Sequence, residues 1–256
     1  MSGRVTRYRA VLAYDGTEYF GFQRQAGDTP TIQGTVEAAL RQVTQQDVTV
    51  IGAGRTDTGV HATGQVIAFD VAWRHETVAL WRALNANLPE SVALQSLSEA
   101  TADFHTRFDA RSRAYTYTLS FAPVRQPIWM RCAWHLATHR PPALEAMQQA
   151  AAGLIGAHDF ATFGTPPQGD STIREVFRSE VSLGAQPKPD CSIVRYEIEG
   201  NAFLYRMVRR IVGGLARVGR GEMAAENFLT AFRAADGTWP NPSAPAHGLC
   251  LTRVTY

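Results

Sequence analysis

A glycine-rich loop between two predicted strands carries the densest group of reactive side chains. Residues 52–61 read Gly-Ala-Gly-Arg-Thr-Asp-Thr-Gly-Val-His. Arg55 and Asp57 are two positions apart, so an extended backbone points both side chains the same way. A neighbouring guanidinium keeps a carboxylate ionised, as a nucleophile must be, and fixes its orientation. The spacing therefore indicates either a nucleophilic Asp57 with Arg55 as its charge partner, or an aspartate that only caps a turn.

The glycines of this loop also invite comparison with phosphate-binding turns. Gly54 and Gly59 have the spacing of a P-loop, but Val60-His61 stands where Lys-Ser/Thr is required. The dinucleotide-binding pattern fails too, because Asp57 replaces its third glycine and a predicted strand follows where a helix is needed. A nucleotide-binding metabolic enzyme is therefore disfavoured.

A second group of side chains is basic. Residues 203–218 have helical periodicity, and the arginines on and just after this helix fall within an arc of roughly 100°. No acidic residue interrupts them before Glu222. We expect this basic stripe to bind a polyanion, although a solvated helix face is the alternative. Its members are Arg206, Arg209, Arg210, Arg217 and Arg220.

Aromatic and basic residues alternate in two neighbouring segments, Phe104–Phe108 and Arg111–Tyr115. Aromatic rings beside guanidinium groups are typical of sites that hold unstacked RNA bases. One of Tyr115 and Tyr117 is expected to be only a core residue of its strand. The seven histidines show no metal-ligand spacing, and we expect His61, His105 and His158 to serve in structure or hydrogen bonding.

Composition agrees with a nucleic-acid partner without requiring one. The net charge of the 256 residues is only +2, yet of the 25 basic residues Lys188 is the one lysine, which leaves 25 − 1 = 24 arginines. The planar fork of arginine suits phosphate oxygens and guanine edges, although a GC-rich coding bias has the same effect. The three cysteines are odd in number and far apart, which fits a reducing compartment. No signal peptide is visible and no apolar run approaches about 18 residues. We therefore expect a cytoplasmic protein.

The elements that position these groups follow from hydrophobic periodicity. The first half has the order β-α-β-β-α-β, which is typical of ferredoxin-like, split βαβ folds. Its predicted parts are a strand at Tyr8–Tyr14, a helix capped by Thr31, strands at Val48–Ile51 and Val66–Val71, a helix around Val78–Leu84, and a strand at Ser91–Leu97.

The second half repeats this order. Its predicted parts are a strand at Tyr115–Phe121, a helix over Leu144–Ile155, a strand with Phe177, Val181 and Leu183 on one side, its antiparallel partner Ile193–Ile198, the basic helix, and a strand at Leu249–Val254. We predict an α+β chain of two halves, residues 1–107 and 108–256. Their mostly antiparallel sheets are expected to form one platform with a central cleft.

Together, these motifs resemble those of the TruA family of tRNA pseudouridine synthases. The resemblance covers nearly the whole chain, and it favours the nucleophile over the turn cap for Asp57. It rests on Gly54–His61, which is similar to the family's catalytic loop, and on Tyr14–Thr17, Phe20–Gln25, Asn85–Pro89, Phe104–Tyr117 and Asn201–Gly214.

The resemblance implies an activity and roles for single residues. It implies isomerisation of uridine to pseudouridine at positions 38, 39 and 40 of the tRNA anticodon stem-loop. The expected enzyme is a homodimer that needs no metal or organic cofactor, with each tRNA lying across both subunits. Asp57 matches the nucleophile, Arg55 its charge partner, and Tyr115 the residue that stacks on the target base. Arg24 and the basic helix, through Arg206, Arg209 and Arg210, match RNA-contacting positions.

Three residues depart from the family pattern. Thr58 replaces an alanine, Phe22 a frequent tryptophan, and Cys250 a frequent tyrosine. None removes a reacting group, although Phe22 leaves the contact of its loop open. The sequence also leaves open whether Asp57 attacks C1′, attacks C6, or acts through a glycal. A tRNA chaperone that binds without modifying is the main alternative, and the Arg55–Asp57 pair disfavours it.

Overall fold

The computed structural model describes residues 4–166, 169–184, 186, 188–236 and 243–256, and its packing divides the chain into two compact units. The first unit contains Met1–Arg111 and Leu251–Tyr256, and the second contains Ser112–Cys250. The last residues of the chain lie in the first unit and not in the second. They do so because Arg111 N donates to Thr255 O at 2.8 Å and the Tyr256 hydroxyl donates to Thr106 O at 2.8 Å.

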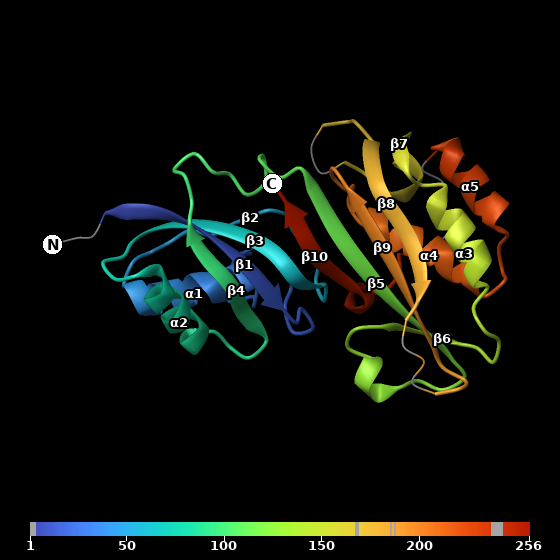
Figure 1. Cartoon of the computed structure of the whole chain (residues 1–256), viewed down its shortest axis with the longest axis horizontal. Helices are drawn as coiled ribbons and strands as arrows, with labels where there is room; N and C mark the ends of the chain where they lie inside the picture. Colours follow the sequence, from blue (N-terminus) through green and yellow to red (C-terminus); the bar gives the residue numbers. More distant parts are fainter. Residues whose placement is uncertain (1–3, 167–168, 185, 187, 237–242) are drawn as a thin grey trace. The chain divides into compact units, whose positions relative to one another are not determined.

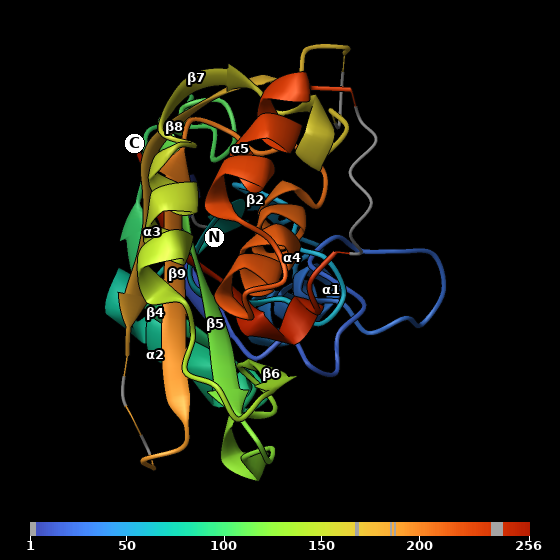
Figure 2. The same ribbon diagram turned by 90° about the vertical axis from the view of Figure 1, so that its right-hand side faces the viewer.

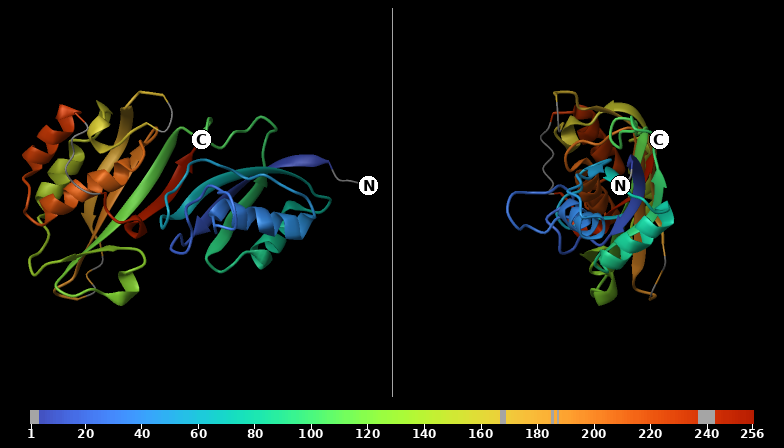
Figure 3. Two further views of the ribbon diagram at one scale, coloured as in Figure 1. Left: turned by 180° about the vertical axis from the view of Figure 1, so that it is seen from behind. Right: turned by 90° about the vertical axis from the view of Figure 1, so that its left-hand side faces the viewer.

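The first unit has the predicted β-α-β-β-α-β order (Figure 1). Its strands lie in the order β4-β1-β3, and both β2 and the last strand, β10, lie on the side of β3 away from β1. Helices α1 and α2 lie next to each other (Figures 1 and 3). The elements are β1 (Val5–Tyr14), α1 (Ile32–Thr44), β2 (Ile51–Gly52), β3 (His61–Ala72), α2 (Thr77–Asn87), β4 (Val92–Glu99) and β10 (Leu249–Thr255).

Helix α1 forms as its sequence predicts. Thr31 caps it, since its hydroxyl accepts from Gly34 N at 3.3 Å. Ile32, Val36 and Leu40 lie on one face and are buried, which supplies the packing that stabilises a short helix. The strand predicted at Val48–Ile51 is shorter than expected, because Val50 N donates to the side chain of Glu37 in α1. Only Ile51–Gly52 pairs with β3.

The second unit repeats most of this order with additions, and the strand that closes the order, β10, lies mainly in the first unit. Strands β5, β9, β8 and β7 are neighbours in that order, and β6 runs parallel to β5. Figure 2 shows α3, α4 and α5 packed together. The elements are β5 (Ser112–Ala122), β6 (Trp134–Ala137), α3 (Leu144–Ala152), β7 (Gly156–Asp159), β8 (Ile173–Leu183), β9 (Ser192–Gly200), α4 (Met207–Gly219), α5 (Ala225–Ala234), and the 3-10 turns Pro127–Trp129, Ala161–Phe163 and Ala246–Gly248.

Two details of the second unit differ from the sequence prediction. Helix α3 ends at Ala152, before Leu154 and Ile155. In β8, Phe177, Val181 and Leu183 do not share a buried side. The pairing of β8 with β9 shifts between Val176 and Arg178, so Val176 takes the buried position and Phe177 is exposed. A bulge of this kind reverses the alternation that the sequence pattern assumed.

The basic helix also begins later than expected. The prediction started it at Phe203, whereas α4 begins at Met207. Tyr205 N donates to Thr165 O at 2.9 Å in an isolated bridge, which holds this stretch out of the helix. Arg206 then has a left-handed backbone with φ of 59°. Across the described ranges, no helix is long and apolar enough to cross a membrane.

Candidate active site

The loop that carries Asp57 lies directly against the turn that follows β1. A Cβ atom added to Gly16 would overlap the carbonyl oxygen of Val60, so the two backbones are in contact. Gly16 N also donates to Nδ1 of His61 at 3.1 Å. Only glycine permits so close an approach of two backbones.

Three further hydrogen bonds fix the loop from the same side. Phe22 N donates to Thr56 O at 3.0 Å, and Gly59 N donates to Tyr19 O at 3.3 Å. The buried hydroxyls of Tyr14 and Thr56 are 2.8 Å apart. The residues on both sides of Asp57 are therefore held by neighbouring backbone.

Asp57 itself begins a tight turn. Val60 N donates to the Asp57 carbonyl at 3.1 Å, and Gly59 has the positive φ of 78° that this turn requires. The Asp57 side chain is half-buried, between buried Thr56 and exposed Thr58. A carboxylate in such a place is reachable by a ligand while its backbone has little freedom.

The predicted partner, Arg55, lies on the exposed side of the loop. Its exposure alone does not fix the orientation of the side chain, so the pairing of Arg55 with Asp57 stays a prediction. An exposed guanidinium is equally available to a phosphate or to the edge of a base.

Residues of β3, together with Phe22 in the segment after β1, also support the loop. Ala53 N donates to Val66 O at 2.8 Å, and the buried Gln65 donates through Nε2 to Gly54 O at 2.8 Å. The ring of Phe22 is buried and packs so close to Gly52 that a Cβ there would overlap it. Phe22 is thus a packing residue of this loop, which explains what that departure from the family pattern does.

In the second unit, β5 separates the two candidate tyrosines by exposure. Tyr117 is buried and its hydroxyl donates to Pro245 O at 2.8 Å. Burial raises the pKa of the Tyr117 phenol well above its ordinary value. Tyr115 is half-buried, and its ring meets Phe203 edge-on with centroids 5.2 Å apart at 88°. As predicted, one of the two is a core residue, and Tyr115 is the accessible one.

The arginines at the two ends of the basic stripe have different surroundings. At the far end, Glu222 lies 3.9 Å from Arg217 and 2.9 Å from Arg220, so part of their charge is offset. At the near end, Arg209 donates through Nε to Ala244 O at 2.7 Å, Arg210 is half-buried, and Arg206 is exposed. Because Arg206 precedes α4, it does not share the predicted helical arc.

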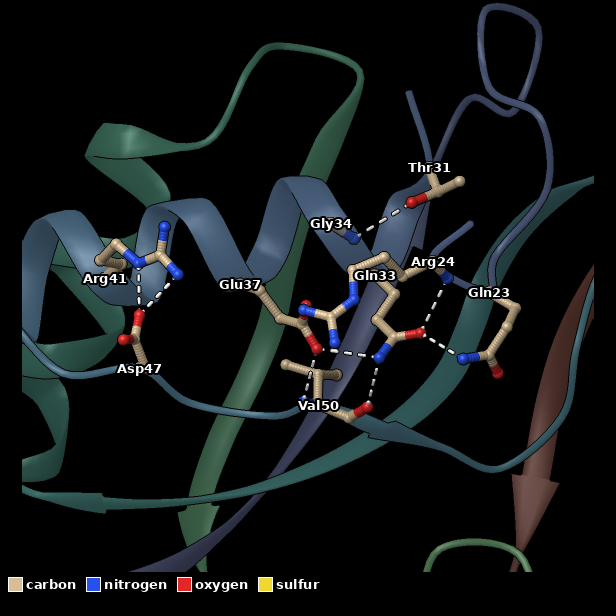
Figure 4. A network of polar contacts seen from close by, with 9 residues as sticks. All are labelled: Gln23, Arg24, Thr31, Gln33, Gly34, Glu37, Arg41, Asp47 and Val50. Atoms are coloured by element: carbon tan, nitrogen blue, oxygen red, sulfur yellow. Dashed lines mark hydrogen bonds and ion pairs between the residues drawn. The ribbon is translucent and has the colours of Figure 1, made fainter. Parts of the chain in front are cut away.

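The remaining predicted contact, Arg24, lies between β1 and α1. Its Nη1 donates to Oε2 of Glu37 at 2.8 Å (Figure 4). The three histidines His61, His105 and His158 form hydrogen bonds, as expected. His61 accepts from Gly16, His105 accepts from Arg107 N at 3.1 Å, and His158 lies 2.9 Å from Ile155 O. Among the residues that the structure describes, no group of three or more His, Cys, Asp or Glu side chains could hold a metal ion.

The sequence of the chain matches a known protein family and several named proteins. The model of a family described as tRNA pseudouridine synthase matches residues 10–109 and 150–256. A Neisseria meningitidis serogroup C protein named tRNA pseudouridine synthase A is 39% identical over 252 residues, 98% of this chain and 92% of that protein. Proteins of the same name from Chloroflexus aurantiacus and Brevibacillus brevis are 42% and 41% identical, covering 96% and 98% of this chain and 87% and 100% of their own lengths.

Solved structures are more distant. In the crystal structure of the archaeal box H/ACA sRNP Nop10-Cbf5 complex, one chain matches with a TM-score of 0.34 and 8% identity over 82% of this chain and 43% of that chain. So weak a likeness adds nothing to the sequence matches. Those matches define an isomerase that acts on tRNA. The chain belongs to the tRNA pseudouridine synthase family.

Proposed function

We propose that this enzyme isomerises uridine to pseudouridine at positions 38, 39 and 40 of the tRNA anticodon stem-loop, with Asp57 as the nucleophile. One observation carries the proposal for Asp57. Its half-buried carboxylate is borne by a loop whose backbone is hydrogen-bonded through Thr56, Gly59 and Val60. The likeness of residues 54–61 to the catalytic loop of this family supports the same role. The choice of positions rests on the family resemblance.

The reaction needs one well-placed carboxylate. The N1–C1′ bond of uridine breaks, a C5–C1′ bond forms, and the proton on C5 is lost while N1 gains one, so no redox change occurs. Attack of the carboxylate at C1′ or at C6 forms a covalent intermediate, which divides one difficult step into easier ones. In a route through a glycal, the same group takes part. A fixed loop lowers the entropic cost of each of these steps.

Other residues hold the RNA. The target base must leave the helical stack, which costs a few kcal/mol, and Tyr115 recovers part of this by stacking on the flipped base. The edge-on ring of Phe203 restricts the orientation of Tyr115 for that task. Arg55 is the charge partner of Asp57, and Arg24, Arg206, Arg209 and Arg210 contact the RNA. We further propose that the enzyme works in the cytoplasm as a homodimer, without a cofactor, and that each tRNA lies across both subunits.

The test uses an unmodified tRNA transcript with uridine at positions 38, 39 and 40, incubated with purified protein and mapped chemically for pseudouridine. We expect product at these positions with the wild-type protein and none with Asp57→Asn, which is nearly isosteric. Asp47→Asn is the matched control, because the Asp47 side chain is 81% exposed on the surface. Product only at other positions would overturn the assignment of the stem-loop. Normal product from Asp57→Asn would overturn the nucleophile.

A further inference from the structure

Helix α1 buries a carboxylate that the reaction does not use. Glu37 is only 8% exposed, although glutamate is seldom buried unless its charge is compensated. It lies on the same helix as the buried Ile32, Val36 and Leu40, at a position that a leucine would fill without any need for partners.

The two oxygens of Glu37 have different partners. Oε1 accepts from Val50 N at 3.0 Å and from Nε2 of Gln33 at 2.8 Å, so it joins α1 to the segment that enters β2 (Figure 4). Oε2 accepts from Nη1 of Arg24 at 2.8 Å. Oε1 thus stabilises the fold of the unit, and Oε2 holds the guanidinium of Arg24.

Gln33 fixes the backbone of the same arginine. It is 4% exposed, and its Oε1 accepts from Arg24 N at 2.9 Å and from Nε2 of Gln23 at 2.7 Å. Its Nε2 also donates to Val50 O at 3.2 Å. Arg24 is therefore held at its amide by Gln33 and at its guanidinium by Glu37.

Arg24 nevertheless remains accessible. Its side chain is 60% exposed, whereas that of Glu37 is 9% exposed, so a ligand in solution can reach the arginine and not the carboxylate. A guanidinium has five donors in a rigid fork, and one contact with Glu37 leaves a face that suits phosphate oxygens. The segment that bears Arg24 also holds the Asp57 loop, through the bond from Phe22 N to Thr56 O.

We propose that Glu37 is a positioning residue that orients Arg24 toward a backbone phosphate of the bound tRNA. This inference rests on the proposed function of Arg24 as an RNA contact. An arginine that is already ordered loses less rotamer freedom on binding than one that moves freely in solvent. Glu37 also offsets part of the charge of Arg24, and the proposal requires that the gain from orientation exceeds this loss.

The substitution Glu37→Gln separates the two oxygens. The amide oxygen can replace Oε1 as acceptor for Val50 and Gln33, while the amide nitrogen presents a donor to Arg24 in place of Oε2. We expect the KM for tRNA to rise by about three- to tenfold, with kcat changed by less than about twofold. Asp47→Asn is the control. It removes the carboxylate partner of Arg41, which lies on the same helix as Glu37, but the two side chains of this pair are 71% and 81% exposed, so KM should stay unchanged.

A double-mutant comparison gives the decisive result. If Glu37 acts through Arg24, the variant with both Glu37→Gln and Arg24→Ala has the same KM as Arg24→Ala alone. An unchanged KM in Glu37→Gln, or effects of the two substitutions that multiply, would overturn the proposal. A purely structural role of Glu37 would lower the melting temperature and kcat together.

Arg24→Lys gives a test that does not depend on the folding of the Glu37 variant. A lysine has one ammonium group, which Glu37 and a phosphate cannot both hold in fixed directions. We expect the KM of Arg24→Lys for tRNA to be higher than that of the wild type by about threefold or more. A wild-type KM in Arg24→Lys would contradict the proposal that Glu37 orients the Arg24 guanidinium toward a phosphate. Failure of the proposed role of Arg24 as an RNA contact is distinguishable, because Arg24→Ala alone would then keep the wild-type KM.

Discussion

The Asp57 loop of the first unit and the basic stripe of the second unit are built in opposite ways. Backbone hydrogen bonds and close glycine contacts fix the loop, which presents one half-buried carboxylate. The stripe presents several arginines, of which Arg217 and Arg220 lie beside Glu222. Chemistry needs one group in one place, whereas the attraction of a polyanion is shared among many groups. Substitutions in the loop should therefore act sharply, and those in the stripe by degrees.

Among substitutions that leave Asp57 itself in place, the largest effect is expected from Gly16→Ala. The new methyl group would overlap Val60 O, so the loop must move, and misplacement by about 1 Å costs a reaction about a hundredfold. We also expect a loss of about 1–3 kcal/mol in the free energy of unfolding. Single-turnover rates and thermal melting measure the two effects.

Gly54→Ala is the control for stability, because a Cβ there meets nothing within 4 Å. Its melting temperature should stay within a few degrees of the wild-type value. If Gly16→Ala kept the wild-type rate, the close contact between the two backbones would have no part in placing Asp57.

The next effect separates the two tyrosines of β5. Tyr115→Phe keeps the stacking ring and should keep tRNA binding, yet we expect turnover to fall by about tenfold or more if the hydroxyl assists a proton transfer. Tyr117→Phe should keep turnover and lose about 1–2 kcal/mol of stability, because Pro245 O is left without its donor. Equal turnover in Tyr115→Phe and the wild type would remove any chemical role for that hydroxyl.

The smallest effect is expected in the stripe. Arg210→Ala should weaken binding of all tRNAs alike and reduce the slope of log K against log salt by about 0.9, the value for one phosphate contact. Arg220→Ala should reduce it less, because Glu222 already offsets its charge. Titrations over a range of salt measure both slopes. Unchanged slopes in both variants would mean that the stripe is an ordinary solvated face.

Much of the fold could be predicted from hydrophobic periodicity, since each half has helices and strands with clear apolar faces. The errors arose where a distant partner takes a backbone group. Val50 N binds Glu37, which shortens β2, and Tyr205 N binds Thr165, which delays the start of α4. Periodicity within a segment contains no information on such partners.

The candidate site shows the same limit. Arg55, Asp57 and Tyr115 stand out by residue type and spacing, whereas Gln65 and Glu37 were missed. Polar residues within a helix or strand usually face solvent, and only the tertiary structure shows that these two are buried and hydrogen-bonded. A signal for Gln65 existed in retrospect, because it directly precedes the apolar run of β3.

The most direct test measures binding and chemistry separately for Asp57→Asn and Arg210→Ala. Dissociation constants and single-turnover rates at saturating enzyme are taken on one tRNA transcript. We expect Asp57→Asn to bind with an affinity within about threefold of the wild type, or slightly tighter, and to form no detectable pseudouridine. Arg210→Ala should bind more weakly and convert bound tRNA at the wild-type rate. Pseudouridine formed at a normal rate by Asp57→Asn would contradict the assignment of the nucleophile.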